Sequence, residues 1–316
     1  MKRVCIVGCG AIGSLYAAHL AQVAEVWAFV RREEHARALN REGLRVSGTH
    51  EFQVRLKATA NPDEVPDCDL GIVATKATQV ESCVAIIGCR FDQGAVISAQ
   101  NGLGSEEIIA EHTRGQVIRG TTFMSGTKHS DTHVQYELNT ATWLGPFEPR
   151  HTPYALVREA AELINASGLK AEPLQDARPA QWSKLIFNAS VNGVSALTGL
   201  PHSRHFADEA EFTSLGHLLH ELIDEGKTVA RAAGVRLHDD PWEMNKIGAR
   251  TNHPPSMLLD VRRQLGTEVD FLSGAIAREA KRLGVPAPLH TAVCRLIRGK
   301  EAAWTFKDEN RAARDN

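Results

Sequence analysis

The chain has 316 residues, of which 43% are hydrophobic, and its 36 basic and 38 acidic residues leave a formal net charge of −2. This length predicts two domains rather than one small core. The balanced charge argues against nucleic acid or a membrane surface as partner, and no stretch reaches the length of a transmembrane helix. The six cysteines form no CxxC pair and no metal-ligand spacing, so we expect buried thiols in a reducing cytoplasm and no metal.

The N-terminal segment has the pattern of a dinucleotide-binding motif. Arg3 to Val7 is an apolar, β-branched run typical of a strand buried on both faces, and a helix is expected from Ser14 to Val23. Between them lies the GxGxxG turn Gly8-Cys9-Gly10-Ala11-Ile12-Gly13. Its glycines would permit a tight turn, the approach of a pyrophosphate to the backbone, and close packing of helix on strand. A glycine-rich turn without a ligand is the alternative, which the strand–turn–helix context disfavours.

The end of the second predicted strand, Glu25 to Val30, indicates which dinucleotide binds. Sites for NAD usually place Asp or Glu there to hold the ribose 2′-hydroxyl. This chain has Arg31 and Arg32 instead, and two guanidiniums suit a 2′-phosphate. A solvated charge cluster is the alternative, because two glutamates follow directly. We favour the phosphate, and therefore NADP(H).

Alternating helices and strands are predicted to continue this domain. After a helix at 35–42, a short hairpin at 44–46 and 52–56 precedes buried strands at 68–74 and 95–98, with a helix at 80–87 between them. Lys76 follows the first buried strand and Gln100-Asn101-Gly102 follows the second. Ligands of open parallel sheets bind at such strand ends, although a solvated lysine and a simple turn are the alternatives. Strands at 117–118, 121–123 and 142–145 are expected to complete the sheet in antiparallel orientation.

The pattern becomes almost continuously helical after about residue 175. The sequence therefore predicts an α/β chain, with a Rossmann dinucleotide-binding domain at 1–174 and an all-helical domain at 175–316. Helices are expected at 181–197 and at 212–233, and another begins at Ser256. A capping box, Thr267-Glu268-Val269-Asp270, is expected to begin a helix that runs to Arg282 and ends at Gly284.

The helix at 181–197 carries three polar residues at a spacing of four. Lys184, Asn188 and Asn192 form one stripe on an otherwise apolar helix. A buried polar group without a partner costs about 1–3 kcal/mol, so the stripe needs partners. A bound ligand is one explanation and a hydrogen-bond network between helices is the other. We favour the ligand.

Together these segments resemble the ketopantoate reductase (2-dehydropantoate 2-reductase) family. The resemblance extends over nearly the whole chain, in the family's order, and rests on the GxGxxG turn, Arg31, Lys76, Gln100-Asn101-Gly102, the Lys184/Asn188/Asn192 helix, Ser256-Met-Leu-x-Asp and Thr267-Glu268-x-Asp270. It implies a cytoplasmic enzyme that reduces a 2-oxo acid with NADPH, foremost ketopantoate to pantoate in pantothenate biosynthesis. The family's active site lies in the cleft between its two domains. A homodimer is compatible with this interpretation.

The resemblance also implies residue roles. Lys184 would be the general acid, and Glu268 would support both the lysine and the substrate. A lysine is suited to this step, because its ammonium can stabilise the developing negative charge on a ketone oxygen and donate a proton to it without a metal. The substrate-binding set is Asn101, Asn188, Asn192 and Ser256. The cofactor-binding set is Gly8, Cys9, Gly10, Ala11, Ile12, Gly13, Arg31, Lys76, Asn101 and Glu268.

Some positions depart from the family's pattern. His202 and His253 stand where family members often have other polar residues, and Pro254-Pro255 replaces small polar residues before Ser256. These changes fall among the residues expected to hold substrate, so reduction of a 2-oxo acid is better supported than ketopantoate itself. The alternatives are a reductase of another branched 2-oxo acid, a 3-hydroxyacid dehydrogenase of the 6-phosphogluconate type, and an NADP-binding redox sensor without turnover.

Overall fold

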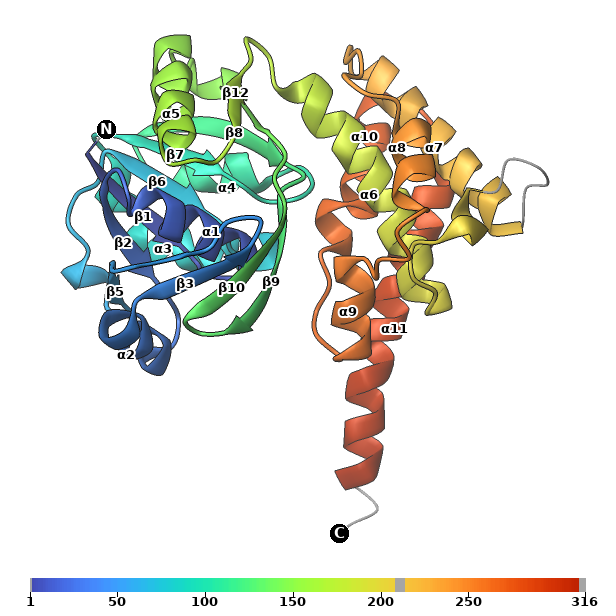
Figure 1. Cartoon of the computed structure of the whole chain (residues 1–316). Coiled ribbons are helices and arrows are strands. Elements are labelled where there is room, and N and C mark those ends of the chain that lie inside the picture. The colour runs from blue at the N-terminus through green and yellow to red at the C-terminus, as the bar shows by residue number, and fades with distance from the viewer. Residues whose placement is uncertain (1, 208–213, 313–316) are drawn as a thin grey trace. The chain divides into compact units, whose positions relative to one another are not determined.

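A computed structural model describes residues 2–207 and 214–312 of the chain (Figure 1). The chain divides into two compact units. The N-terminal unit comprises Met1–Gln100 and Gly104–Ala177, and the helical unit comprises Asn101–Leu103 and Arg178–Asn316. A sheet unit followed by a helical unit confirms the predicted fold class.

The N-terminal unit contains an eight-stranded sheet in the order β12-β11-β8-β7-β6-β1-β2-β5. Its strands are β1 (Arg3–Val7), β2 (Glu25–Phe29), β5 (Lys57–Thr59), β6 (Leu70–Val73), β7 (Ala95–Ser98), β8 (Gln116–Thr122), β11 (Thr142–Pro146) and β12 (Ala171–Pro173). The pairs from β5 to β8 are parallel, and β11 is antiparallel to β8 as expected. The antiparallel orientation expected for strands at 117–118 and 121–123 is wrong, because a single strand, β8, covers Gln116–Thr122 and runs parallel to β7. The reason is the helix between β7 and β8, which returns the chain in a parallel crossover.

Both faces of this sheet are covered by helices, as the apolar strands predict. Alternate residues of β1 enter different cores, Val4 and Ile6 on one face and Cys5 and Val7 on the other. The helices are α1 (Ala11–Leu20), α2 (Glu33–Glu42), α3 (Val80–Ile87), α4 (Ser105–His112) and α5 (Tyr154–Ala166). The first helix begins three residues earlier than expected, because Gly10 is its N-cap. The GxGxxG turn therefore leads directly into the first turn of a helix.

A second, four-stranded sheet has the order β4-β3-β10-β9. Its strands are β3 (Leu44–Gly48), β4 (Phe52–Val54), β9 (Ser125–Ser130) and β10 (His133–Leu138). The predicted hairpin is confirmed by the antiparallel pairing of β3 with β4. The hairpin of β9 and β10 was not predicted, and its strand β10 pairs in parallel with β3. This sheet packs on α1, where a Cβ at Gly126 would lie 3.1 Å from Leu15.

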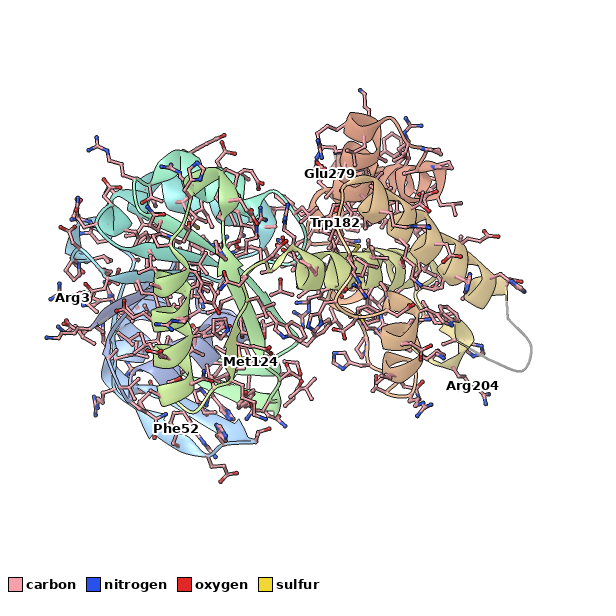
Figure 2. The ribbon with its side chains drawn as sticks, turned by 90° about the horizontal axis from the view of Figure 1, so that it is seen from above. Arg3, Phe52, Met124, Trp182, Arg204 and Glu279 are labelled. Atoms are coloured by element: carbon pink, nitrogen blue, oxygen red, sulfur yellow. The ribbon has the colours of Figure 1, made fainter. Side chains whose placement is uncertain are left out.

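The helical unit is built around α6 (Arg178–Thr198), which contacts every other long helix of this unit within the described residues. The others are α7 (Ser214–Ala232), α8 (Pro241–Gly248), α9 (Ser256–Arg262), α10 (Ser273–Leu283) and α11 (Pro288–Ala312). Trp182 on α6 is buried in this core (Figure 2). Phe212 and Thr213, the first residues of the helix predicted at 212–233, lie outside the described residues. Ser256 begins a helix as predicted.

The predicted capping box is wrong. The Thr267 hydroxyl accepts a hydrogen bond of 3.3 Å from the Val269 amide, but the return bond of a capping box does not form, because the Thr267 amide donates to Glu301 at 2.7 Å and the Asp270 carboxylate is bound by Arg298. A 3₁₀ turn at Val269–Phe271 follows, and α10 begins only at Ser273. The helix ends at Gly284 in the left-handed conformation, as expected. Across the residues described, no helix combines the length and hydrophobicity of a membrane span.

Candidate active site

The GxGxxG turn has the backbone shape that receives an anion. Gly8 has a φ of +92°, and a Cβ there would lie 2.6 Å from Thr75 Cγ2. A Cβ at Gly13 would lie 1.9 Å from the Gly8 carbonyl oxygen, so α1 can approach the turn only with glycine there. Gly10 is exposed, and a Cβ there would meet no atom within 4 Å. No side chain caps α1 at Gly10, so the N-terminus of this ten-residue helix suits a pyrophosphate.

A cavity of about 420 Å³ adjoins this turn within the N-terminal unit. It is of the size that binds a nucleotide portion of a cofactor. Its lining includes three cations and no carboxylate among the residues described, the cations being Arg31, Arg32 and Lys128. The remaining lining is Val7, Gly8, Cys9, Phe29, Val30, His35, Ala60, Thr75, Gln79, Ser82, Cys83 and Ile86. The cavity thus fits an anionic portion of a dinucleotide.

The two arginines after β2 differ in their partners. Arg32 donates two hydrogen bonds from Nη2 to the Asp131 carboxylate, of 2.5 and 2.6 Å. Arg31 is exposed and forms no ion pair within the described part of the chain. Glu33 does not neutralise it, because that carboxylate pairs with Arg37 at 3.2 Å. Arg31 is therefore the arginine whose guanidinium is available to a bound anion.

Two other strand-end residues of the N-terminal unit lie outside the cavity lining. Lys76 follows β6 and precedes a 3₁₀ turn, Ala77–Gln79. Gln100 is buried and fixes the ends of two strands, because its Nε2 donates to the Val73 carbonyl at 2.8 Å and its Oε1 accepts from Ser98 at 2.9 Å. Gln100 thus has a structural role at this sheet edge.

Asn101 belongs to the helical unit although it follows a strand of the sheet. The Leu103 amide donates to the Phe271 carbonyl at 3.1 Å, and Gln181 Nε2 donates to the Gly102 carbonyl at 3.2 Å. A Cβ at Gly102 would lie 2.1 Å from the Phe271 oxygen, so this close contact requires glycine. The Asn188 amide, 3.5 Å from Asn101 Oδ1, faces this segment from α6. The structure therefore brings Asn101 to the predicted stripe.

Lys184 of the stripe lies under two opposing influences. Burial lowers its pKa from 10.5 to about 8, while the negative charge of Glu268 acts to raise it. The two residues predicted to act together are thus electrostatically coupled. A pKa of about 8 leaves most of the Lys184 amine protonated at neutral pH but makes the proton easier to release, which suits a proton donor.

The third residue of the stripe connects to the predicted substrate serine. Asn192 Oδ1 accepts a hydrogen bond of 3.3 Å from the Met257 amide at the start of α9. Ser256, the preceding residue, is exposed. The Asn192 oxygen therefore takes part in a hydrogen bond between helices, which was the alternative to a ligand. Ser256 presents its hydroxyl to solvent or ligand.

His202 and His253 have different environments. His202 is buried, and its Nε2 lies 2.9 Å from Asn245 Oδ1. A Cβ at Gly248 would lie 2.5 Å from the His202 ring, which shows how tightly this core is packed. His253 is exposed and contributes its backbone carbonyl to the His202 amide. Two residues that touch the candidate site segments, Lys128 and Gln181, were not singled out from the sequence.

Comparison with known proteins decides the family. A sequence profile described as "Ketopantoate reductase PanE/ApbA" matches residues 4–149, and its C-terminal counterpart matches residues 176–301. The 2-dehydropantoate 2-reductase of Archaeoglobus fulgidus is 31% identical over 303 residues, which cover 96% of this chain and 99% of that protein. The chain belongs to the ketopantoate reductase family. The resemblance inferred from its motifs is thereby confirmed, and as a member of a reductase family it is an oxidoreductase.

Solved structures agree with this ketopantoate reductase fold. The crystal structure of a PanE/ApbA family ketopantoate reductase from Ralstonia eutropha JMP134 has a TM-score of 0.84 at 27% identity, covering 96% of this chain and 99% of that one. A D-mandelate dehydrogenase with NADH and anilino(oxo)acetate has a TM-score of 0.85 at 23% identity, with the same coverage. That likeness shows a shared fold. The glycine turn and cavity of this ketopantoate reductase family member fit a nicotinamide dinucleotide.

Proposed function

We propose that this protein reduces ketopantoate to pantoate with NADPH, a step of pantothenate biosynthesis. The observation that carries the proposal is Lys184, whose pKa burial lowers to about 8 beside the opposing charge of Glu268. Such a lysine can hold a proton at neutral pH and release it to an oxygen that gains charge. It lies on the same helix as Asn188 and Asn192.

The chain's own residues divide the work of carbonyl reduction. When bound, the dinucleotide supplies a hydride to the carbonyl carbon. The Lys184 ammonium would stabilise the negative charge on the carbonyl oxygen and then protonate it. The Glu268 carboxylate would keep enough of the lysine protonated. Neutral donors on Asn188 and Ser256 would orient the acid without adding charge.

Two further observations support the cofactor and the substrate. Arg31 is exposed at the cavity and has no carboxylate partner in the described chain, which favours the 2′-phosphate of NADPH. Relatives from Archaeoglobus fulgidus and Pyrococcus horikoshii, 31% and 29% identical, are named 2-dehydropantoate 2-reductase. These names favour ketopantoate among the 2-oxo acids.

The experiment is an NADPH-oxidation assay with ketopantoate, 2-oxoisovalerate and benzoylformate. A site that hydrogen-bonds the ketopantoate hydroxyl leaves its polar groups unpaired with an acid that lacks it. We therefore expect kcat/KM for ketopantoate to exceed that for 2-oxoisovalerate by at least about tenfold. Equal or higher efficiency with another acid would contradict ketopantoate as substrate.

One alternative has a specific observation in its favour. Pro254-Pro255 and the exposed His253 directly precede Ser256, where the resemblance expects substrate to bind. Because these residues depart from the family's pattern at an expected substrate contact, another branched 2-oxo acid is the second candidate, and the same substrate panel would reveal it. Binding of NADPH without turnover of any acid would instead indicate a redox sensor.

A further inference from the structure

A lysine from the second sheet reaches the glycine turn. Lys128 on β9 donates a hydrogen bond of 2.8 Å from Nζ to the Cys9 carbonyl, between the first two glycines. Its side chain is 24% exposed and lines the cavity. The hydroxyl of Ser14 donates to the same carbonyl at 3.3 Å from within α1. The turn is therefore fixed by hydrogen bonds both from its own helix, α1, and from β9, which lies far along the chain.

Holding this carbonyl also orients the following amide. The C=O and N–H of a trans peptide point in opposite directions, so a fixed Cys9 carbonyl fixes the direction of the Gly10 N–H. Gly10 is the N-cap of α1, where backbone N–H groups have no helical acceptor. Lys128 thus acts on the part of the backbone that is suited to an anion.

The lysine is itself held in place by neighbours that leave its charge in the cavity. Asp131 Oδ1 lies 3.4 Å from Lys128 Nζ and is shared with Arg32. His35 Nε2 lies 3.2 Å from the same Nζ. Burial, with the nearby charge of Lys128, lowers the pKa of His35, so that ring adds no charge at neutral pH. The cluster of Arg32, Lys128 and Asp131 carries one net positive charge, in addition to that of Arg31.

We infer that Lys128 is a cofactor-positioning residue: it fixes the glycine turn for the pyrophosphate and contributes positive charge to the cavity that adjoins this turn. The second sheet would then take part in dinucleotide binding. This inference rests on the proposed function in that a dinucleotide binds, but not on which 2-oxo acid is reduced. Lys128 acts on the pyrophosphate, which NADPH and NADH share, whereas Arg31 distinguishes them.

The test measures direct binding of NADPH and of NADH, monitored by cofactor fluorescence in the absence of a 2-oxo acid. Lys128→Met should raise Kd about tenfold for both cofactors, the effect of one lost charge-assisted contact, and leave their ratio within about twofold of the wild type. Lys128→Arg should recover most of this loss. The salt dependence of binding should be shallower in Lys128→Met, because one screened charge is gone. Lys170→Met, which removes an exposed lysine of the same unit, is the matched control.

The outcomes separate this inference from the proposed function. A wild-type protein that binds neither cofactor would refute the proposed function. Unchanged affinity in Lys128→Met would overturn the inference, as would a loss confined to NADPH, which would place Lys128 at the 2′-phosphate. Circular dichroism checks the fold of each variant. If Lys128→Met is unfolded, Lys128→Gln replaces it, with the same loss for both cofactors expected and the same two results overturning the inference.

Discussion

At the scale of single residues, side chains of the same type have different environments. Arg31 is open to the cavity, whereas Arg32 is bound to Asp131. Lys184 has a pKa lowered by burial, whereas Lys128 is held at a backbone carbonyl. Residue type alone therefore does not decide function, and the predictions at this scale compare such matched residues.

The first prediction concerns the pH dependence of catalysis. Burial lowers the pKa of Lys184 to about 8, so its ammonium form predominates below that pH and the neutral amine above it. A reaction that takes its proton from this ammonium should slow as pH rises through about 8. We expect kcat for reduction of the 2-oxo acid to fall in that window, measured at constant ionic strength across neutral and alkaline pH.

The variant Lys184→Ala controls for the origin of this transition. It should lower kcat by about 10²–10⁴-fold, the usual contribution of a positioned proton donor, and should lack the transition near pH 8. Cofactor binding should be retained, because the glycine turn and Arg31 belong to the other unit. Near-normal turnover in a folded Lys184→Ala protein would contradict the role of this lysine.

The second prediction compares the two arginines. Arg31→Ala should lower the ratio of kcat/KM for NADPH to that for NADH by about tenfold or more, since a charge-assisted contact to the 2′-phosphate is lost. Arg32→Ala removes a half-exposed ion pair with Asp131, which contributes about 0–1 kcal/mol to stability. It should change the ratio less. Equal ratios in wild type and Arg31→Ala would show that Arg31 does not read the phosphate.

At the scale of elements, predictable parts are those with a local pattern. The strand–turn–helix at Arg3–Leu20 is predictable because three glycines at fixed spacing specify its geometry. The polar stripe on α6 is predictable because helical periodicity aligns Lys184 with Asn188. The hairpin of β9 and β10 is not, since in it only Val134 and Tyr136 are buried.

Long-range contacts explain what the sequence could not reveal about the candidate site. Lys128 and Cys9 are 119 residues apart, and no local pattern connects them. The Thr267 segment fails in the opposite way, because a capping motif is present in the sequence but only its hydroxyl bond forms. Tertiary contacts such as that of the Thr267 amide with Glu301, at 2.7 Å, override the local preference.

The third prediction concerns the segment that connects β7 to α4. Gln181→Met removes the donor to the Gly102 carbonyl and should let Asn101 move away from Asn188. We expect KM for the 2-oxo acid to rise about fivefold, the effect of one neutral hydrogen bond. The control is Ser183→Ala on the same helix, whose hydroxyl bonds the Asp239 carbonyl instead. An equal rise of KM in both variants would reduce Gln181 to a general structural residue.

At the scale of the whole molecule, each unit contains a buried neutral histidine. His19 of the N-terminal unit and His290 of the helical unit are 1% and 0% exposed. Burial lowers the pKa of each from 6.5 to about 4. The His19 ring is bound to the Leu15 carbonyl at 2.8 Å, and the His290 ring to the Leu222 carbonyl at 3.0 Å. Folding therefore disfavours protonation of a buried histidine in both units, in the same pH range.

The last prediction is that mild acid destabilises both units. Between pH 6.5 and about 4 the unfolded chain binds a proton at each of these histidines and the folded chain does not, so stability falls as pH falls. From pH 7 to pH 5 each should contribute a loss of about 2 kcal/mol in the free energy of unfolding. Buried carboxylates add little in this window, because their ordinary pKa values lie below it. Urea unfolding at the two pH values measures the loss, and His290→Gln should reduce the pH dependence in the helical unit alone. Stability that is unchanged at pH 5 would mean that these rings are already charged, or exposed, in the folded protein.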